Sequence, residues 1–253
     1  MSAPLIFKEI PSLSQWVPSE SDGAFEKKHC VIALDWDDTL LCSSWLSATG
    51  YAGLDIVPSE KVLASCALVA NSVAALIIEA QKYGDVIIVT NASEGWVQGT
   101  CALLMPTVWP LISSLKIFSA QHLHSDKTPS THLWKKFVFR DYIWSVYGYD
   151  FKHAVNFVSI GDGLCEEYAV HALNGIVICG HITGKSLRLI EKSNPEILIK
   201  QLNLVTEGIR HIAMCPQSLR LSMNISVLEA PKTCHQSVNK ENIISRDTSV
   251  GYD

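Results

Sequence analysis

Short runs of Val, Ile, Leu and Ala recur along the chain and predict strands that are buried on both faces. Strands of this kind read as continuous apolar runs, because helices cover both sides of a parallel sheet. The first run ends abruptly in the polar tetrapeptide that spans residues 35–38, which reads Asp-Trp-Asp-Asp. The predicted strands cover residues 29–34, 86–89, 116–119, 154–160 and 175–179.

Between these runs the apolar residues recur every three or four positions, which is the spacing of a helix with one buried face. The clearest case spans residues 59–83, where Pro58 and Ser59 suit a helix start and Gly84 suits its end. Strands that alternate with helices indicate βαβ units, so we expect an α/β protein with one Rossmann-like, doubly wound, mostly parallel sheet. The other predicted helices cover residues 93–104, 130 or 131 to 147, 164 to about 173, and 195–214.

Composition along the chain divides it into three parts. Residues 1–28 mix Pro, Ser, Glu and Lys without a period and are predicted to form a loose lead-in. Residues 29–223 hold the α/β domain, and the polar residues 224–253 are expected to form a mobile tail. Within the domain, residues 41–58 and 105–130 are expected to be short insertions, and 121–130 a polar loop, so we expect little or no cap domain.

Charge and composition argue against several classes of protein. The 253 residues are 48% hydrophobic and can bury a sizeable core, and the net charge of -5 does not suit a nucleic-acid binder. We find no apolar run of about 20 residues and no secretory signal, so we expect a cytoplasmic protein without a membrane partner. The eight cysteines form no C-x-x-C pair and are predicted to be reduced thiols, mostly buried.

Polar side chains follow three of the predicted strands, at the edge where sites form in open parallel sheets. Asp35 and Asp37 follow the first strand, Thr90 the second and Asp162 the fourth. Each of them alone could be an ordinary turn or capping residue. Together the three aspartates would gather negative charge at one edge, which a cation must neutralise. An all-oxygen set of this kind suits Mg²⁺.

These segments resemble the characteristic motifs of the haloacid dehalogenase superfamily. Residues 31–40, VIALDWDDTL, resemble its first motif, D-x-D-x-[TV]-[LV] after an apolar strand. Residues 86–90, VIIVT, resemble the second motif, a strand that ends in Thr or Ser. Residues 158–162, VSIGD, with Glu166 four positions later, look like the acidic fourth motif. The tryptophan between the two aspartates is also similar to a group of uncharacterised eukaryotic members, which indicates no substrate.

The third motif of that superfamily is a single lysine near a helix start, between the second and fourth motifs. Lys135, within the sequence LWKKF, fits this position best. Lys127 and Lys136 are alternatives that the sequence leaves open.

The resemblance implies an Mg²⁺-dependent phosphohydrolase that acts on phosphate monoesters, either of a small metabolite or of a phosphoprotein. Asp35 would be the nucleophile and form an aspartyl-phosphate, and Asp37 would be the general acid and base. Asp37 also favours phosphoryl transfer, because dehalogenases of this superfamily lack the second acid. The phosphoryl group would be bound by Thr90, Asn91 and Lys135. The Mg²⁺ ligands would be Asp35, the Asp37 carbonyl, Asp162 and Glu166, the last through waters or by orienting Asp162.

Two other functions remain open. The chain could be a catalytically silent member of the superfamily that serves as a binding scaffold, although the complete set of acids argues against this. A receiver-type signalling domain also gathers acids and Mg²⁺ in a parallel sheet, but it places its phosphorylated aspartate at a later strand.

Several residues near these motifs are expected to have other roles. We expect Asp38 to be structural, and Trp36 to face either the core or the substrate. Trp96, just after the second motif, is a weaker candidate for a substrate-facing position. The histidines at 122, 124 and 132 are interpreted as residues of a surface loop rather than as metal ligands.

Overall fold

The structure is a computed structural model that describes residues 29–51, 53–175, 177, 181–225 and 228. The predicted lead-in, residues 1–28, and nearly all of the predicted tail lie outside the described residues. The boundaries proposed for these two segments therefore stay predictions.

Six parallel strands form one sheet in the order β3-β2-β1-β4-β5-β6. The central strand β1 pairs with β2 on one side and with β4 on the other. The strand order therefore reverses next to β1, the place where sites form in open α/β sheets. The strands are β1 (Cys30–Leu34), β2 (Asp85–Thr90), β3 (Lys116–Ser119), β4 (Ala154–Gly161), β5 (His181–Arg188) and β6 (Leu219–Ser222).

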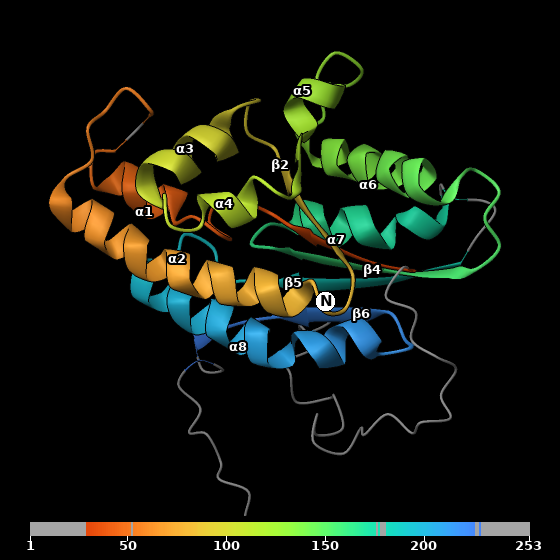
Figure 1. Ribbon diagram of the computed structural model, residues 1–253. Coiled ribbons are helices and arrows are strands. Elements are labelled where there is room, and N and C mark those ends of the chain that lie inside the picture. The colour runs from red at the N-terminus through yellow and green to blue at the C-terminus, as the bar shows by residue number, and fades with distance from the viewer. Residues whose placement is uncertain (1–28, 52, 176, 178–180, 226–227, 229–253) are drawn as a thin grey trace, which may run out of the picture.

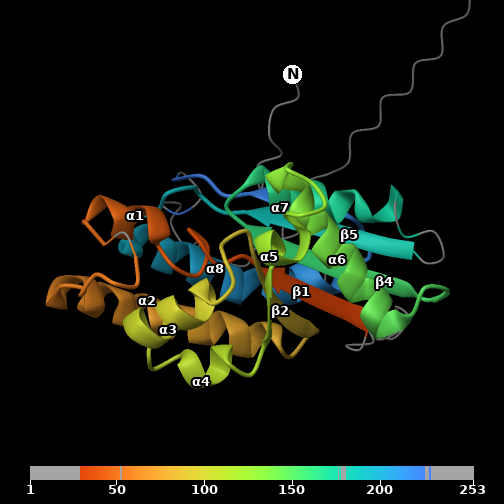
Figure 2. The same ribbon diagram turned by 90° about the horizontal axis from the view of Figure 1, so that it is seen from above.

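Helices cover both faces of the sheet, which confirms the predicted Rossmann-like α/β fold. Figures 1 and 2 show α2 and α8 together on one face, and α6 and α7 on the other. The helices are α1 (Ser43–Ala48), α2 (Glu60–Ala80), α3 (Trp96–Leu104), α4 (Trp109–Ile112), α5 (Ala120–His124), α6 (Thr131–Tyr147), α7 (Leu164–His171) and α8 (Pro195–Met214).

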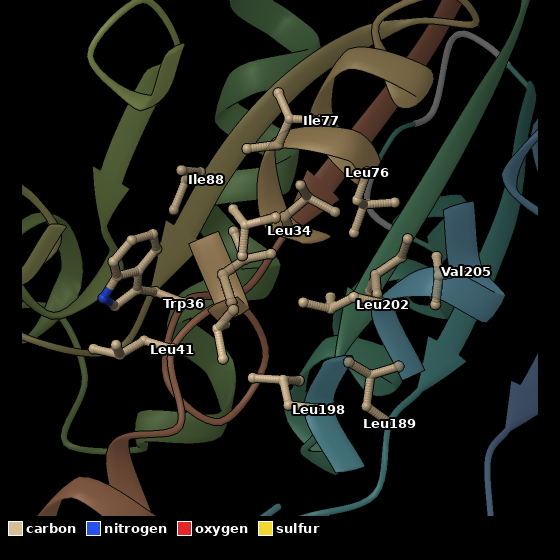
Figure 3. Packing of buried hydrophobic residues seen from close by; sticks show 14 of the residues in the cluster. Leu34, Trp36, Leu41, Leu76, Ile77, Ile88, Leu189, Leu198, Leu202 and Val205 are labelled. Atoms are coloured by element: carbon tan, nitrogen blue, oxygen red, sulfur yellow. The ribbon is translucent and has the colours of Figure 1, made fainter. Parts of the chain in front are cut away.

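Two hydrophobic clusters hold these layers together, one on each face of the sheet. Successive side chains of β1 alternate between them, so that Ile32 and Leu34 join the α2/α8 cluster and Val31 and Ala33 join the α6/α7 cluster. Figure 3 shows side chains of α2 and α8 packed around Leu34. A fully buried Val, Leu or Ile side chain stabilises the fold by roughly 1.5–3 kcal/mol, so these clusters fix β1 at the centre of the sheet.

Helix α2 begins and ends where local chemistry requires it. The Ser59 hydroxyl accepts a hydrogen bond from the Val62 amide at 3.3 Å, which caps the first turn. Four residues after the helix, a Cβ atom on Gly84 would lie 2.5 Å from the Cys30 carbonyl oxygen. Glycine therefore allows the turn to pass beside the start of β1.

The expectation that no apolar run reaches membrane-spanning length is wrong for α2. Among the described helices it is the one that could cross a bilayer by length and composition, with a mean hydropathy of 2.0. In this fold 44% of that stretch is buried, and the helix packs against α8 as a core helix does.

The predicted fifth strand, residues 175–179, is also wrong where the structure describes it. Gly175 ends a short 3₁₀ helix (Leu173–Gly175), and residues 176 and 178–180 lie outside the described residues. The fifth strand is β5, whose sequence HITGKSLR contains few apolar residues. A Cβ atom on Gly184 would lie 3.0 Å from the Val170 carbonyl oxygen. Close packing against α7, and not an apolar sequence, therefore accounts for a strand at this position.

The segments expected to be irregular also hold short elements. Residues 41–58 include α1, and the expected polar loop at 121–130 begins with α5. The Ser119 hydroxyl accepts the His122 amide at 3.1 Å and caps α5. His124 is buried and not on a surface loop, whereas His122 is exposed as expected. Strand β6 is a further element that the apolar pattern does not predict.

A buried lysine on β5, Lys185, should make the stability of the fold depend on pH. The Lys185 ammonium donates to the Ala213 carbonyl oxygen at 2.8 Å, near the end of α8. Burial lowers the pKa of Lys185 from 10.5 to about 8, so below pH 8 the folded state carries a buried charge at full cost. The wild-type free energy of unfolding should therefore gain about 3 kcal/mol from this group between pH 8 and 10.5.

Lys185→Met should raise the free energy of unfolding at pH 7 by about 2 kcal/mol, because it removes that cost and loses one hydrogen bond worth about 1 kcal/mol. Urea denaturation at several pH values measures the effect. The advantage of the variant should vanish before the pH reaches 10.5, and at that pH the variant should be less stable by about 1 kcal/mol, because only the lost hydrogen bond remains. A variant less stable than wild type at pH 7 would contradict this assignment of the cost.

Candidate active site

The candidate site lies at the carboxyl ends of β1, β2 and β4, which are neighbours in the sheet. Leu34 pairs with Ile160, and the Asp35 amide donates to the Ile160 carbonyl oxygen at 2.9 Å. Asp35 and Asp162 therefore both come just after the paired ends of β1 and β4. Thr90 ends β2 on the other side of β1. Parallel strands lie about 4.8 Å apart, so the fold brings these distant parts of the sequence to one edge.

Asp35, Lys135 and Glu166 form a buried ion-pair group at this edge. The Lys135 ammonium lies 2.6 Å from an Asp35 carboxylate oxygen and also bonds to a Glu166 carboxylate oxygen. All three side chains are at most 8% exposed. Lys135 reaches the site from α6 and Glu166 from α7, two helices that pack against each other. Buried charges require partners of this kind.

The structure distinguishes the three lysines that the sequence leaves open. Lys135 contacts Asp35 directly. The Lys127 ammonium instead donates to the Leu123 carbonyl oxygen at 2.9 Å, and the Lys136 ammonium lies 5.8 Å from the centre of the Tyr168 ring. Of the three, Lys135 is the one whose ammonium lies in the candidate site.

Glu166 fits into space that two glycines leave open. A Cβ atom on Gly161 would overlap the Glu166 side chain, and one on Gly163 would lie 2.8 Å from its second carboxylate oxygen. That second oxygen is buried and has no hydrogen-bond partner among the described residues. An unpaired buried carboxylate oxygen is costly, and it indicates a place where a donor or a cation binds.

The charges of this group do not balance. Burial alone would raise the pKa of Glu166, but the Lys135 ammonium outweighs it and lowers that pKa. Burial raises the pKa of Asp35 to about 8, against the opposing pull of the same ammonium. Burial, followed by the charges of Glu166 and Asp38, raises the pKa of Asp162 to about 6. One ammonium cannot neutralise three carboxylates, so the site has a deficit of positive charge.

Asp37 is held by two donors. The Thr90 hydroxyl donates to one of its carboxylate oxygens at 3.2 Å, and the Trp96 indole N–H donates to the other at 2.9 Å. From the sequence, Trp96 is a candidate for a substrate-facing position. In the structure its indole N–H donates to Asp37 and orients that side chain. The spacing of the motifs does not reveal this contact, because it joins the loop after β1 to the first turn of α3.

The residues on either side of Asp37 anchor the same loop. Trp36 is fully buried in the core, and its indole N–H donates to the Thr100 hydroxyl of α3 at 3.0 Å. Figure 3 shows Trp36 packed beside Leu41 in that core. Asp38 has a positive φ of 52° and accepts the Ser44 amide at 2.9 Å, which confirms its expected structural role. The loop is therefore fixed at both sides of Asp37.

Asn91 is tied to α6 through its side-chain nitrogen, whereas its Oδ1 atom is buried without a hydrogen-bond partner among the described residues. Its side-chain amide donates to the Thr131 carbonyl oxygen at 3.3 Å. The predicted contact between Asn91 and a phosphoryl group therefore stays a prediction.

The cysteines described by the structure are free thiols, as expected. Cys165, beside Glu166, donates to the Glu166 carboxylate at 3.1 Å, and burial raises its pKa to about 12. A thiol of this kind is not a nucleophile at neutral pH.

Comparisons with known proteins give no match. No protein-family model matches the chain, and no curated protein or solved structure is significantly similar to it. The established result is a single six-stranded, all-parallel α/β sheet.

These residues fit a magnesium ion. Among the described residues, no group of three or more His, Cys, Asp or Glu side chains is placed so that it could hold a metal ion by itself. Mg²⁺ does not require such a group, since it usually binds one or two carboxylates and keeps waters and phosphate oxygens as its other ligands. The unpaired oxygen of Glu166 and the surplus of carboxylates are the features that a divalent cation would satisfy.

Proposed function

We propose that the chain is an Mg²⁺-dependent phosphohydrolase of the haloacid dehalogenase type that cleaves phosphate monoesters. The observation that carries the proposal is the surplus of carboxylates around the Lys135 ammonium at the carboxyl edge of the sheet. A cluster of this kind is costly unless a cation neutralises it, and a bound cation would in turn attract an anionic substrate. The order of the motif residues on β1, β2 and β4 supports the same family.

Asp35 is the proposed nucleophile. Its carboxylate would attack phosphorus in line with the leaving oxygen and form an aspartyl-phosphate, which water then hydrolyses. Lys135 already bonds to Asp35, so its ammonium is placed to donate to a phosphoryl oxygen beside that carboxylate. Asp35, Asp162 and the Asp37 carbonyl would hold Mg²⁺, with Glu166 at its waters. When bound, Mg²⁺ neutralises phosphoryl charge and lets two anions approach each other.

Asp37 is the proposed acid and base. Two residues after the nucleophile, its carboxyl group would protonate the leaving alkoxide and later take a proton from the attacking water. The Thr90 hydroxyl and the Trp96 indole N–H hold this carboxyl group in place. General acid catalysis depends on such placement, because the proton must be within hydrogen-bond reach of the leaving oxygen.

Release of p-nitrophenol from p-nitrophenyl phosphate by the full chain, with and without Mg²⁺, tests the proposal. Activity that requires Mg²⁺ and disappears on chelation supports it. If a broad panel of phosphate esters gives no turnover, the chain is instead a binding scaffold with the same fold. Binding of Mg²⁺, measured by the rise in melting temperature, should be seen in either case.

Trp96→Phe should reduce turnover of alkyl phosphates more than turnover of aryl phosphates. The substitution keeps an aromatic ring but removes the donor to Asp37, so protonation of the leaving group suffers. We expect kcat for glycerol 2-phosphate to fall by about tenfold. The value for p-nitrophenyl phosphate should change less than about threefold, because nitrophenolate leaves without needing a proton.

The matched control for this prediction is Trp109→Phe. Trp109 is a half-buried tryptophan of α4, whereas the tryptophan that donates to Asp37 is Trp96. The control should change kcat for the two substrates by the same factor. An equal loss on both substrates in Trp96→Phe would show that Trp96 supports the fold rather than the orientation of Asp37.

A further inference from the structure

A small cavity opens beside the candidate site, between the ends of β2 and β3. Its volume is about 110 Å³, enough for several waters or for a group of about half a dozen heavy atoms. The first turn of α3 and helix α5 form its sides, and Figure 1 shows these helices on either side of the end of β2. Thr90 lines the cavity and also bonds to Asp37, so the cavity and the site share a wall.

The cavity lies on the side of the site where Asp37 is held. Asp37 contacts Thr90 and Trp96, and Gly95, the residue before Trp96, lines the cavity. In an in-line displacement the leaving oxygen lies opposite the nucleophile. With Asp35 as nucleophile and Asp37 as acid, the leaving oxygen is at Asp37. The alcohol part of the substrate therefore extends toward this cavity.

The described residues that line the cavity are polar at its mouth and include no lysine or arginine. There the Glu94 Oε2 and His122 Nδ1 atoms lie 3.4 Å apart, and both side chains are more than half exposed. The half-buried Gln98 adds an amide with donors and an acceptor. Ile117 and Leu123 supply apolar wall. Such a mixture suits hydroxyl groups, and the Glu94 carboxylate disfavours a second negative charge on the ligand.

We propose that this cavity receives the alcohol part of the substrate and selects phosphomonoesters of small, uncharged polyols over those of carboxylated alcohols. This inference rests on the proposed phosphohydrolase function and adds a substrate class to it. The small volume of the cavity suits a short alcohol, and Glu94 sets its charge preference.

Charge reversal at Glu94 tests the inference. The ratio of kcat/KM for 3-phosphoglycerate to that for glycerol 2-phosphate is measured with Mg²⁺ in the wild type and in Glu94→Lys. We expect the wild type to favour glycerol 2-phosphate and the variant to raise the ratio by on the order of tenfold, because a carboxylate near the mouth then meets a cation. Glu196→Lys, an exposed reversal on α8, should leave the ratio unchanged.

The outcomes separate this inference from the function on which it rests. If p-nitrophenyl phosphate is hydrolysed but Glu94→Lys leaves the ratio as it was, the cavity does not hold the alcohol and the inference is overturned. If nothing is hydrolysed, the proposed function fails. In that case calorimetry measures the binding constants of the same two esters to wild type and to Glu94→Lys. The ratio of these binding constants then takes the place of the kcat/KM ratio. An equal melting temperature of the two proteins confirms that the fold is unchanged.

Discussion

Asp35→Asn is expected to lower kcat for p-nitrophenyl phosphate by at least roughly 10³-fold. The amide has nearly the shape of the carboxylate but cannot form an acyl phosphate, so the loss reports the missing nucleophile. The side chain is buried against Lys135, where the amide can still accept from the ammonium. The variant should therefore remain folded, which circular dichroism and its melting temperature verify.

The matched control for the nucleophile is Asp85→Asn. Asp85 begins β2 at the opposite, amino edge of the sheet and is exposed. This control should keep its activity within about twofold, as expected of a surface residue remote from the site. If Asp35→Asn instead keeps more than about a tenth of the wild-type rate, Asp35 is not the nucleophile and the aspartyl-phosphate route has to be given up.

Lys135→Met is expected to lower the free energy of unfolding by about 3–5 kcal/mol in the absence of Mg²⁺. Burial would lower the pKa of Lys135, but Asp35 and Glu166 together raise it above its usual range, so the group is charged in the folded protein. Without the ammonium, the buried Asp35 and Glu166 carboxyl groups have no counter-ion, so Glu166 is left as an unpaired buried charge or must take up a proton. Urea denaturation in the presence of a chelator measures the loss.

Two further variants show whether stranded charge is the cause. Lys136→Met changes the next residue, which lies over aromatic rings, and should alter stability by no more than about 0.5 kcal/mol. Adding Glu166→Gln to Lys135→Met removes one stranded charge and should restore at least about 1 kcal/mol. A double variant as unstable as the single one would point to lost packing of the lysine stem instead.

Much of the fold follows from local pattern. The apolar runs that lead to Asp35, Thr90 and Asp162 predict β1, β2 and β4, and all three strands form where expected. Short-range periodicity is sufficient here, because these strands are buried on both faces and must be apolar throughout. The pattern does not predict β5 for the converse reason, since that strand carries Gly184 and Lys185 inside the sheet.

The sequence predicts only in part which motif residues lie close together in the fold. The ends of parallel strands share one edge of a sheet, so Asp35, Thr90 and Asp162 had to gather once the strand order was known. The motif favours Lys135 over Lys136 without excluding Lys136. Adjacent helical residues face different directions, and only the packing of α6 decides that Lys135 is the buried one.

By itself, the sequence determined the α/β class, the parallel strands and the set of acids at their ends, because these depend on local periodicity and on chain order. Tertiary structure alone decided that Lys135 bridges Asp35 and Glu166 and that the Trp96 indole holds Asp37. It also left the second Glu166 oxygen without a partner among the described residues. These contacts join segments far apart in the chain, and only the packing of α3, α6 and α7 against the sheet sets their distances.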